Sequence, residues 1–97
     1  MTFSIFWSPK AEAEFIEILI YLESEFGINI TLRCMEDVEK MLDHIAEFPF
    51  TFVSYDDGSV RRAVVNKQLS IFYRINEGIV ELLSFWDNRR NLETLNI

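Results

Sequence analysis

The residues of this chain whose type and spacing are suited to a chemical role are the basic ones. All six basic residues of the second half lie between Arg61 and Arg90. Residues 1–50 hold three basic and ten acidic side chains, a balance of −7, whereas residues 51–97 hold six of each. Clustered cations bind phosphates, but the acidic half would repel a nucleic acid. The charge pattern argues against nucleic-acid binding over the whole surface and leaves open one local basic site.

Three runs of β-branched and aromatic residues position most of these cations. They extend over Val60–Val65, Leu69–Ile75 and Ile79–Trp86, and are separated by Asn66–Gln68 and Asn76–Gly78. Runs bounded by Asn and Gly are typical of strands joined by tight hairpins. We therefore predict an antiparallel meander of three strands. The third run is apolar on both faces, so the sequence does not determine its register. For the same reason it does not determine which arginines face an open sheet surface.

A strand and a helix are predicted before the meander. Side chains alternate with a period of two over Thr2–Trp7, which indicates a strand. Ser8 can cap the following helix, and Pro9 fits its first position because no hydrogen bond is lost there. The helix reaches about Phe26, and Gly27 ends it. Its apolar stripe, at spacings of three and four, consists of Ala11, Phe15, Ile18, Leu22 and Phe26.

A second helix is predicted over Asn29–Phe48, and Pro49 ends it. Its apolar stripe consists of Ile30, Cys34, Val38, Met41, Ile45 and Phe48. The connection after Gly27 is so short that the two helices should form an antiparallel hairpin. Phe50–Ser59 is predicted to be a loop. The polar tail Asp87–Ile97 fits a short helix, a strand extension or a disordered end.

The expected order is β-α-α-β-β-β in a single domain over residues 1–97. The first strand can pair in parallel with the meander after the helical hairpin has crossed the sheet. The helices would cover one sheet face and leave the other partly open, which is a two-layer α+β domain. Apolar side chains such as some of Phe6, Phe72 and Tyr73 cannot all be buried in one layer. An amphipathic segment of a partner would cover them.

The sequence also bears on the compartment. No apolar run reaches the roughly 18 residues that a membrane span needs. The first residues lack the basic region and cleavage site of a signal peptide. One cysteine, Cys34, excludes an internal disulfide and suits a reducing cytosol. We expect a cytoplasmic protein that has no membrane segment and needs neither a metal nor another cofactor.

Several segments together resemble the RelE/ParE superfamily of toxins from type II toxin–antitoxin systems, the plasmid stabilisation protein family. Trp7–Ala11 is similar to the start of that family's helical hairpin, and Phe48–Pro49 is similar to the residues that end its second helix. Arg62–Lys67 and Ile71–Ile75 resemble its central strands, and Leu82–Arg90 resembles its closing strand and tail. The resemblance covers nearly the whole chain. It implies a RelE/ParE-like fold with the helical hairpin packed on one face of an antiparallel-rich sheet.

The resemblance implies a toxin that a cognate antitoxin binds and silences in a hetero-oligomer. ParE-like members block DNA gyrase, whereas RelE-like members cut mRNA on the ribosome without a metal. A non-toxic member that only binds its antitoxin is a third possibility. We expect the ParE-like function, because the residues for RNA cleavage are incomplete. The expected contacts to a partner are Phe72, Tyr73, Trp86 and Arg90.

RNA cleavage through the 2′-OH needs a base, cations that hold the phosphate, and an acid for the leaving oxygen. The resemblance offers Arg62 and Arg74 as cations at recurring basic positions. Nucleases of the YoeB-like branch carry a His-Tyr pair where this chain has Trp86 and Asp87, so Asp87 could be a base but the acid is missing. If the chain is a nuclease, the candidate catalytic residues are Arg62, Lys67, Arg74, Asp87 and Arg89.

Overall fold

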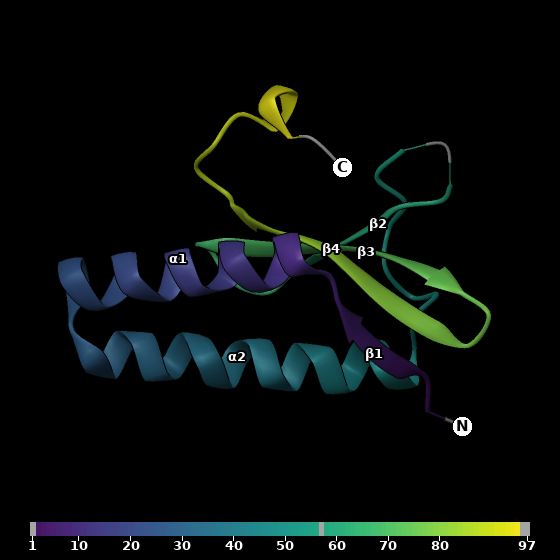
Figure 1. Cartoon of the computed structure of the whole chain (residues 1–97), viewed down its shortest axis with the longest axis horizontal. Coiled ribbons are helices and arrows are strands. Elements are labelled where there is room, and N and C mark those ends of the chain that lie inside the picture. Colours follow the sequence, from purple (N-terminus) through teal and green to yellow (C-terminus); the bar gives the residue numbers. More distant parts are fainter. Residues whose placement is uncertain (1, 57, 96–97) are drawn as a thin grey trace.

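The computed structural model describes residues 2–56 and 58–95, and its elements follow the predicted order. In chain order the elements are β1 (Ser4–Trp7), α1 (Pro9–Phe26), α2 (Ile28–Glu47), β2 (Arg61–Val64), β3 (Leu69–Asn76), β4 (Ile79–Asp87) and the short 3-10 helix η1 (Leu92–Thr94). Figure 1 shows the two long helices side by side beneath the sheet. The strands of the meander and both helices therefore lie where the sequence pattern predicts them.

The helical hairpin depends on its two end residues. The Ser8 side-chain oxygen accepts a hydrogen bond from the backbone N–H of Ala11 at 3.1 Å and caps α1. Gly27 ends α1 with a φ of 90°, a conformation that disfavours residues with a Cβ. Because Gly27 alone joins α1 to α2, the helices are antiparallel. In the described part of the chain, no helix is long and apolar enough to cross a membrane.

The sheet has the strand order β1-β4-β3-β2. β1 runs parallel to β4, with Ser4 opposite Ile79 and Trp7 opposite Leu82. The other two pairings, β2 with β3 and β3 with β4, are antiparallel. The parallel pairing is possible because the helical hairpin carries the chain back across the sheet before β2 begins. The predicted β-α-α-β-β-β order and α+β architecture are confirmed.

The main core lies between the helical hairpin and one face of the sheet. Trp7 of β1 stacks on Phe85 of β4, with ring centroids 5.0 Å apart and planes 9° apart. Phe15 of α1 stacks on the same Phe85 ring at 4.8 Å. Phe85 is only 2% exposed. This aromatic stack fixes α1 against the end of β4, and that junction carries the candidate site.

The second face of the sheet is also covered, by the loop before β2 and by the C-terminal tail (Figure 1). Val60, Phe72 and Trp86 form a second buried cluster, against which Leu83, Leu92 and Leu95 pack. The ring of Tyr55 meets Phe72 edge-on, with centroids 4.8 Å apart. The prediction of a partly open second face is therefore wrong, because the chain supplies its own apolar cover there.

Phe72 and Tyr73 are both fully buried, which contradicts their predicted place on an open surface. Tyr73 points to the helical side, where its hydroxyl donates a hydrogen bond to the Pro49 carbonyl oxygen at 2.6 Å. Burial raises the pKa of Tyr73 to about 12. Phe72 points to the opposite side, beneath the loop and tail. Of the three residues expected at the open face, only Phe6 is exposed, at 53%.

Candidate functional site

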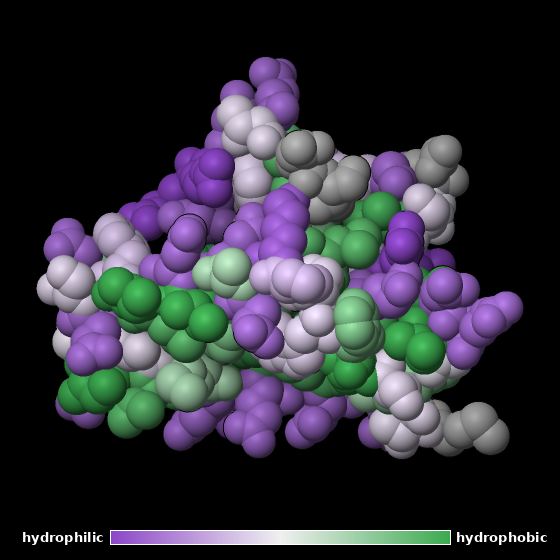
Figure 2. All heavy atoms as spheres, in the orientation of Figure 1, coloured by the Kyte–Doolittle hydropathy of each residue, from purple (hydrophilic) through white to green (hydrophobic). Residues whose placement is uncertain are grey.

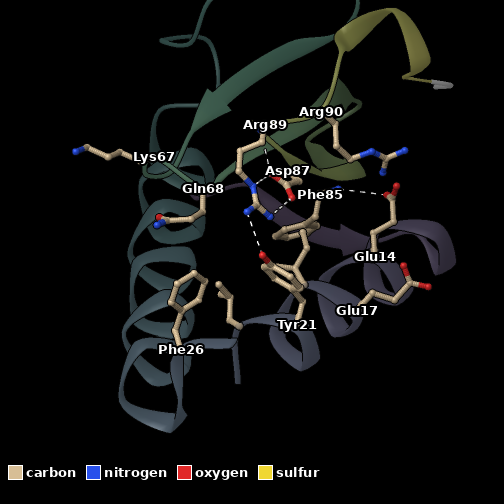
Figure 3. Close-up of a pocket in the computed structure, with 12 residues that line it drawn as sticks. Glu14, Glu17, Tyr21, Phe26, Lys67, Gln68, Phe85, Asp87, Arg89 and Arg90 are labelled. Carbon is tan, nitrogen blue, oxygen red and sulfur yellow. Dashed lines mark hydrogen bonds and ion pairs between the residues drawn. The ribbon is translucent and has the colours of Figure 1, made fainter. Parts of the chain in front are cut away.

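A cavity of about 510 Å³ lies between α1, the turn after β2 and the end of β4 (Figure 3). Its apolar lining comes from both layers and consists of Ile18, Leu22, Phe26 and Phe85, with the ring of Tyr21. Its polar lining residues are Glu14, Glu17, Lys67, Gln68, Asp87, Arg89 and Arg90. An apolar cavity bordered by a few charged groups is the usual form of a binding site. We therefore take this cavity as the candidate site.

Arg89 makes the most extensive polar contacts in the cavity. Its Nε and Nη2 atoms donate hydrogen bonds to the two carboxylate oxygens of Asp87, at 3.0 and 2.7 Å. Its Nη1 atom donates to the Tyr21 hydroxyl at 3.1 Å, and its guanidinium lies 5.0 Å from the centroid of that ring. Bidentate pairing of this kind fixes both partners. Arg89 thus ties the residues after β4 to α1, and Asp87 balances its charge.

The hydrogen bonds from Arg89 hold the pKa of Asp87 below its ordinary value. We predict that an NMR titration of the carboxyl groups finds the pKa of Asp87 below the ordinary value for aspartate, and that Arg89→Gln raises it back towards that value. Because the pKa is lower in the folded state, the contact stabilises the fold above the unfolded-state pKa, and this contribution disappears as the pH falls through the folded-state pKa.

The matched control for this titration is Arg90→Gln. Arg90 is a smaller cause of the same shift and acts on Asp87 through its charge alone. The control should therefore move the Asp87 midpoint less than Arg89→Gln does. An Asp87 pKa at or above the ordinary value in the unsubstituted chain, or a larger effect from the Arg90 variant, would contradict the geometry of the site.

The structure brings together only some of the predicted catalytic residues. Lys67, Asp87 and Arg89 line the same cavity. Arg74 lies elsewhere, near the turn between β3 and β4, where its Nε donates to a carboxylate oxygen of Glu81 at 2.6 Å. The set proposed for phosphate binding is therefore split between two ends of the sheet.

Arg62 belongs to a hydrogen-bond network on the second sheet face. Its Nε donates to the Ser70 hydroxyl oxygen at 3.2 Å, and its Nη2 donates to Oδ1 of Asn88 at 3.2 Å. The Ser70 hydroxyl donates to the same Asn88 oxygen at 2.6 Å, and Nδ2 of Asn88 donates to the carbonyl oxygen of Asn66 at 3.0 Å. Asn88 is not among the site residues predicted from the sequence, although an amide directly after a strand is a recognisable turn signal.

Trp86 and Arg90, two of the expected partner contacts, lie together near the end of β4. The Arg90 guanidinium is 4.6 Å from the centroid of the Trp86 ring. Trp86 is 2% exposed, and its indole N–H has no acceptor among the described residues. Trp86 is therefore not a surface contact in this conformation of the chain.

The outer side of the helical hairpin carries exposed apolar side chains (Figure 2). On α1 these are Ile16 and Ile20, at 49% and 65% exposure. On α2 they are Ile28, Leu32 and Met35, each more than two-fifths exposed. We call these residues the hairpin patch. The α1 pair is four residues apart and the α2 residues are four and three apart, so each group lies on one side of its helix.

Comparison with known proteins supports the fold. No family model and no curated protein matches this chain. A solved structure, the chromosomal ParDE TA (toxin–antitoxin) system from P. aeruginosa, contains a chain of similar shape, with a TM-score of 0.75 and 16% sequence identity. The match covers 89% of this chain and 96% of that chain. At this identity the similarity establishes the fold alone, and the predicted α+β fold with the order β-α-α-β-β-β is confirmed.

Proposed function

We propose that this chain is the toxin of a type II toxin–antitoxin pair and that a cognate antitoxin binds and neutralises it. We further propose that it acts in the ParE-like way, by binding a target such as DNA gyrase rather than by cleaving RNA. The observation that carries the proposal is an exposed apolar hairpin patch on a chain whose fold matches one from a toxin–antitoxin system.

The hairpin patch supports a protein partner. Soluble chains rarely leave several large aliphatic side chains exposed side by side, and such patches commonly mark protein interfaces. Acidic side chains lie on the same exposed helices, among them Glu12, Glu23 and Glu39. An amphipathic antitoxin segment that presents aliphatic and basic residues would match both the apolar and the charged parts of this surface.

A binding function is also supported by the contacts of the candidate catalytic residues. Asp87 is paired with Arg89, and Arg74 is paired with Glu81. A carboxylate whose pKa lies below its ordinary value is a weak general base at neutral pH. The alternative function is that of a RelE-like mRNA endonuclease, in which Arg62, Lys67 and Arg74 would act on RNA.

Expression in bacteria tests this proposal. Induction of this chain alone should stop growth, and co-expression of the product of the neighbouring gene should restore growth and co-purify with it. Arg74→Ala should leave the arrest intact, whereas Ile20→Asp should weaken co-purification because it places a charge in the patch. Harmless induction would contradict a toxin. Loss of the arrest in a folded Arg74→Ala variant would favour the nuclease.

A further inference from the structure

The loop between α2 and β2 carries a second exposed apolar surface, the loop surface, which consists of Phe48, Phe50 and Val53, at 50%, 63% and 77% exposure. We propose that the loop surface is the part of the toxin that contacts its target, and that the target offers an apolar pocket with a carboxylate at its rim. The inference rests on the proposed function, because it names the surface through which a binding toxin would act.

The inner side of this loop is attached to the core. The Phe52 ring packs against the main core cluster and meets the Tyr73 ring edge-on, with centroids 6.4 Å apart. The Tyr73 hydroxyl donates a hydrogen bond to the Pro49 carbonyl oxygen at 2.6 Å. The Thr51 N–H donates to the Phe48 carbonyl oxygen at 3.2 Å. These contacts hold the exposed side chains in one arrangement, and a preorganised surface loses less conformational freedom when it binds a partner.

Arg61 of β2 brings a cation to the loop surface. Its Nη1 atom donates to the carbonyl oxygens of Phe50 and Phe52, at 3.3 and 2.7 Å, and its guanidinium lies 5.4 Å from the centroid of the Phe50 ring. The two ion pairs among the described residues involve other arginines, Arg74 and Arg89. Carbonyl oxygens leave the charge of Arg61 unneutralised, so a carboxylate of the partner would be attracted to it. Aromatic residues and arginine are also enriched in protein interfaces.

The loop surface is separate from the hairpin patch. The patch residues of α2, Ile28, Leu32 and Met35, lie in the first half of that helix, whereas Phe48 directly follows its last residue, Glu47. α2 has 20 residues, so its two ends are about 30 Å apart. Figure 1 shows the loop leaving the helical hairpin at the end opposite to the turn between α1 and α2. The chain therefore offers two distinct apolar surfaces, one for the antitoxin and one for the target.

Graded induction in bacteria tests the proposal with the variants Phe50→Ser and Val53→Asp. The readout is the amount of induced chain, measured by immunoblot, that halves the growth rate. Each variant should raise this amount about tenfold or more, because a central anchor of an interface commonly contributes that much to binding. Val64→Ser is the matched control and should leave the amount unchanged, since Val64 is 54% exposed on β2 outside the loop surface. All three variants should still co-purify with the product of the neighbouring gene.

Substitutions of Arg61 test the carboxylate at the rim of the pocket. Arg61→Gln should also raise the amount of chain that halves the growth rate, and Arg61→Lys should raise it less because it keeps the positive charge. An Arg61→Gln variant as potent as the unsubstituted chain would contradict a carboxylate at this place.

The proposal is overturned if folded Phe50→Ser and Val53→Asp variants halve the growth rate at the same amount as the control. Loss of the neighbouring gene product would assign the loop surface to the antitoxin instead, and a dimer of the chain that the substitutions dissociate would assign it to a second copy. If both variants lack a cooperative thermal transition, the loop is an integral part of the core and the proposal is wrong. An unsubstituted chain that never slows growth would contradict the proposed function itself.

Discussion

Phe85→Ala is expected to lower the free energy of unfolding by about 3–5 kcal/mol, the usual cost of truncating a large buried aromatic side chain. Phe85 stacks on Trp7 and Phe15 at once, so the substitution leaves a cavity where β1, α1 and β4 meet. Total stability for a domain of this length is about 5–15 kcal/mol. Thermal unfolding followed by circular dichroism should show Tm falling by roughly 12 °C or more.

The matched control for this experiment is Phe6→Ala. It removes the same atoms from a side chain that is 53% exposed, so little apolar surface is returned to water. We expect a loss of about 1 kcal/mol or less. Equal losses for the two variants would contradict the placement of Phe85 at the junction of the two layers.

Asn88→Ala is expected to cost about 2–3 kcal/mol, because it removes the acceptor shared by Arg62 and Ser70. Ser70 is fully buried, so its hydroxyl would be left without an acceptor in a place that water does not reach. The donor to the Asn66 carbonyl oxygen is lost as well. Urea unfolding should report the change as a lower midpoint with an unchanged slope.

Asn29→Ala serves as the control for that variant. Asn29 is exposed on α2, and a surface substitution there should change the free energy of unfolding by less than about 0.5 kcal/mol. If Asn88→Ala were as mild as the control, the network on the second sheet face would not be a stabilising feature of the fold.

The layered fold was predictable because its signals are local. Ser8, Pro9 and Gly27 mark the ends of α1, and runs of β-branched residues mark the strands. The short connection at Gly27 decides the direction of α2, and the crossover by the hairpin then permits the parallel pairing of β1. Each of these inferences depends on neighbours in the sequence rather than on contacts between distant residues.

The second sheet face was not predictable from the same signals. Leu92 and Leu95 stand alone in a polar tail, and two leucines make no periodic pattern. The register of β4 was also undetermined, because the strand is apolar on both faces. In the structure the pairing of β3 with β4 shifts between Phe72 and Tyr73, which is a bulge-like irregularity that no residue pattern announces.

The sequence predicted several residues of the candidate site by their type, but it did not predict which side chains contact one another. Lys67, Asp87 and Arg89 do meet at one cavity. The bond between Arg89 and Tyr21 joins residues far apart in the chain, so the spacing of charges could not reveal it. The separation of Arg74 from this group also depends on strand pairing. Arg74 lies near the end of β3, whereas Asp87 lies opposite Leu69, at the start of β3.

The most direct test of the central claim is pulse labelling of DNA and protein synthesis immediately after this chain is induced alone in bacteria. We predict that DNA synthesis stops first, as expected of a ParE-like toxin that binds a target such as gyrase. If protein synthesis collapses first, the account of a binding toxin is wrong and the arginines become catalytic candidates. If neither changes, the fold would describe a relationship without toxicity.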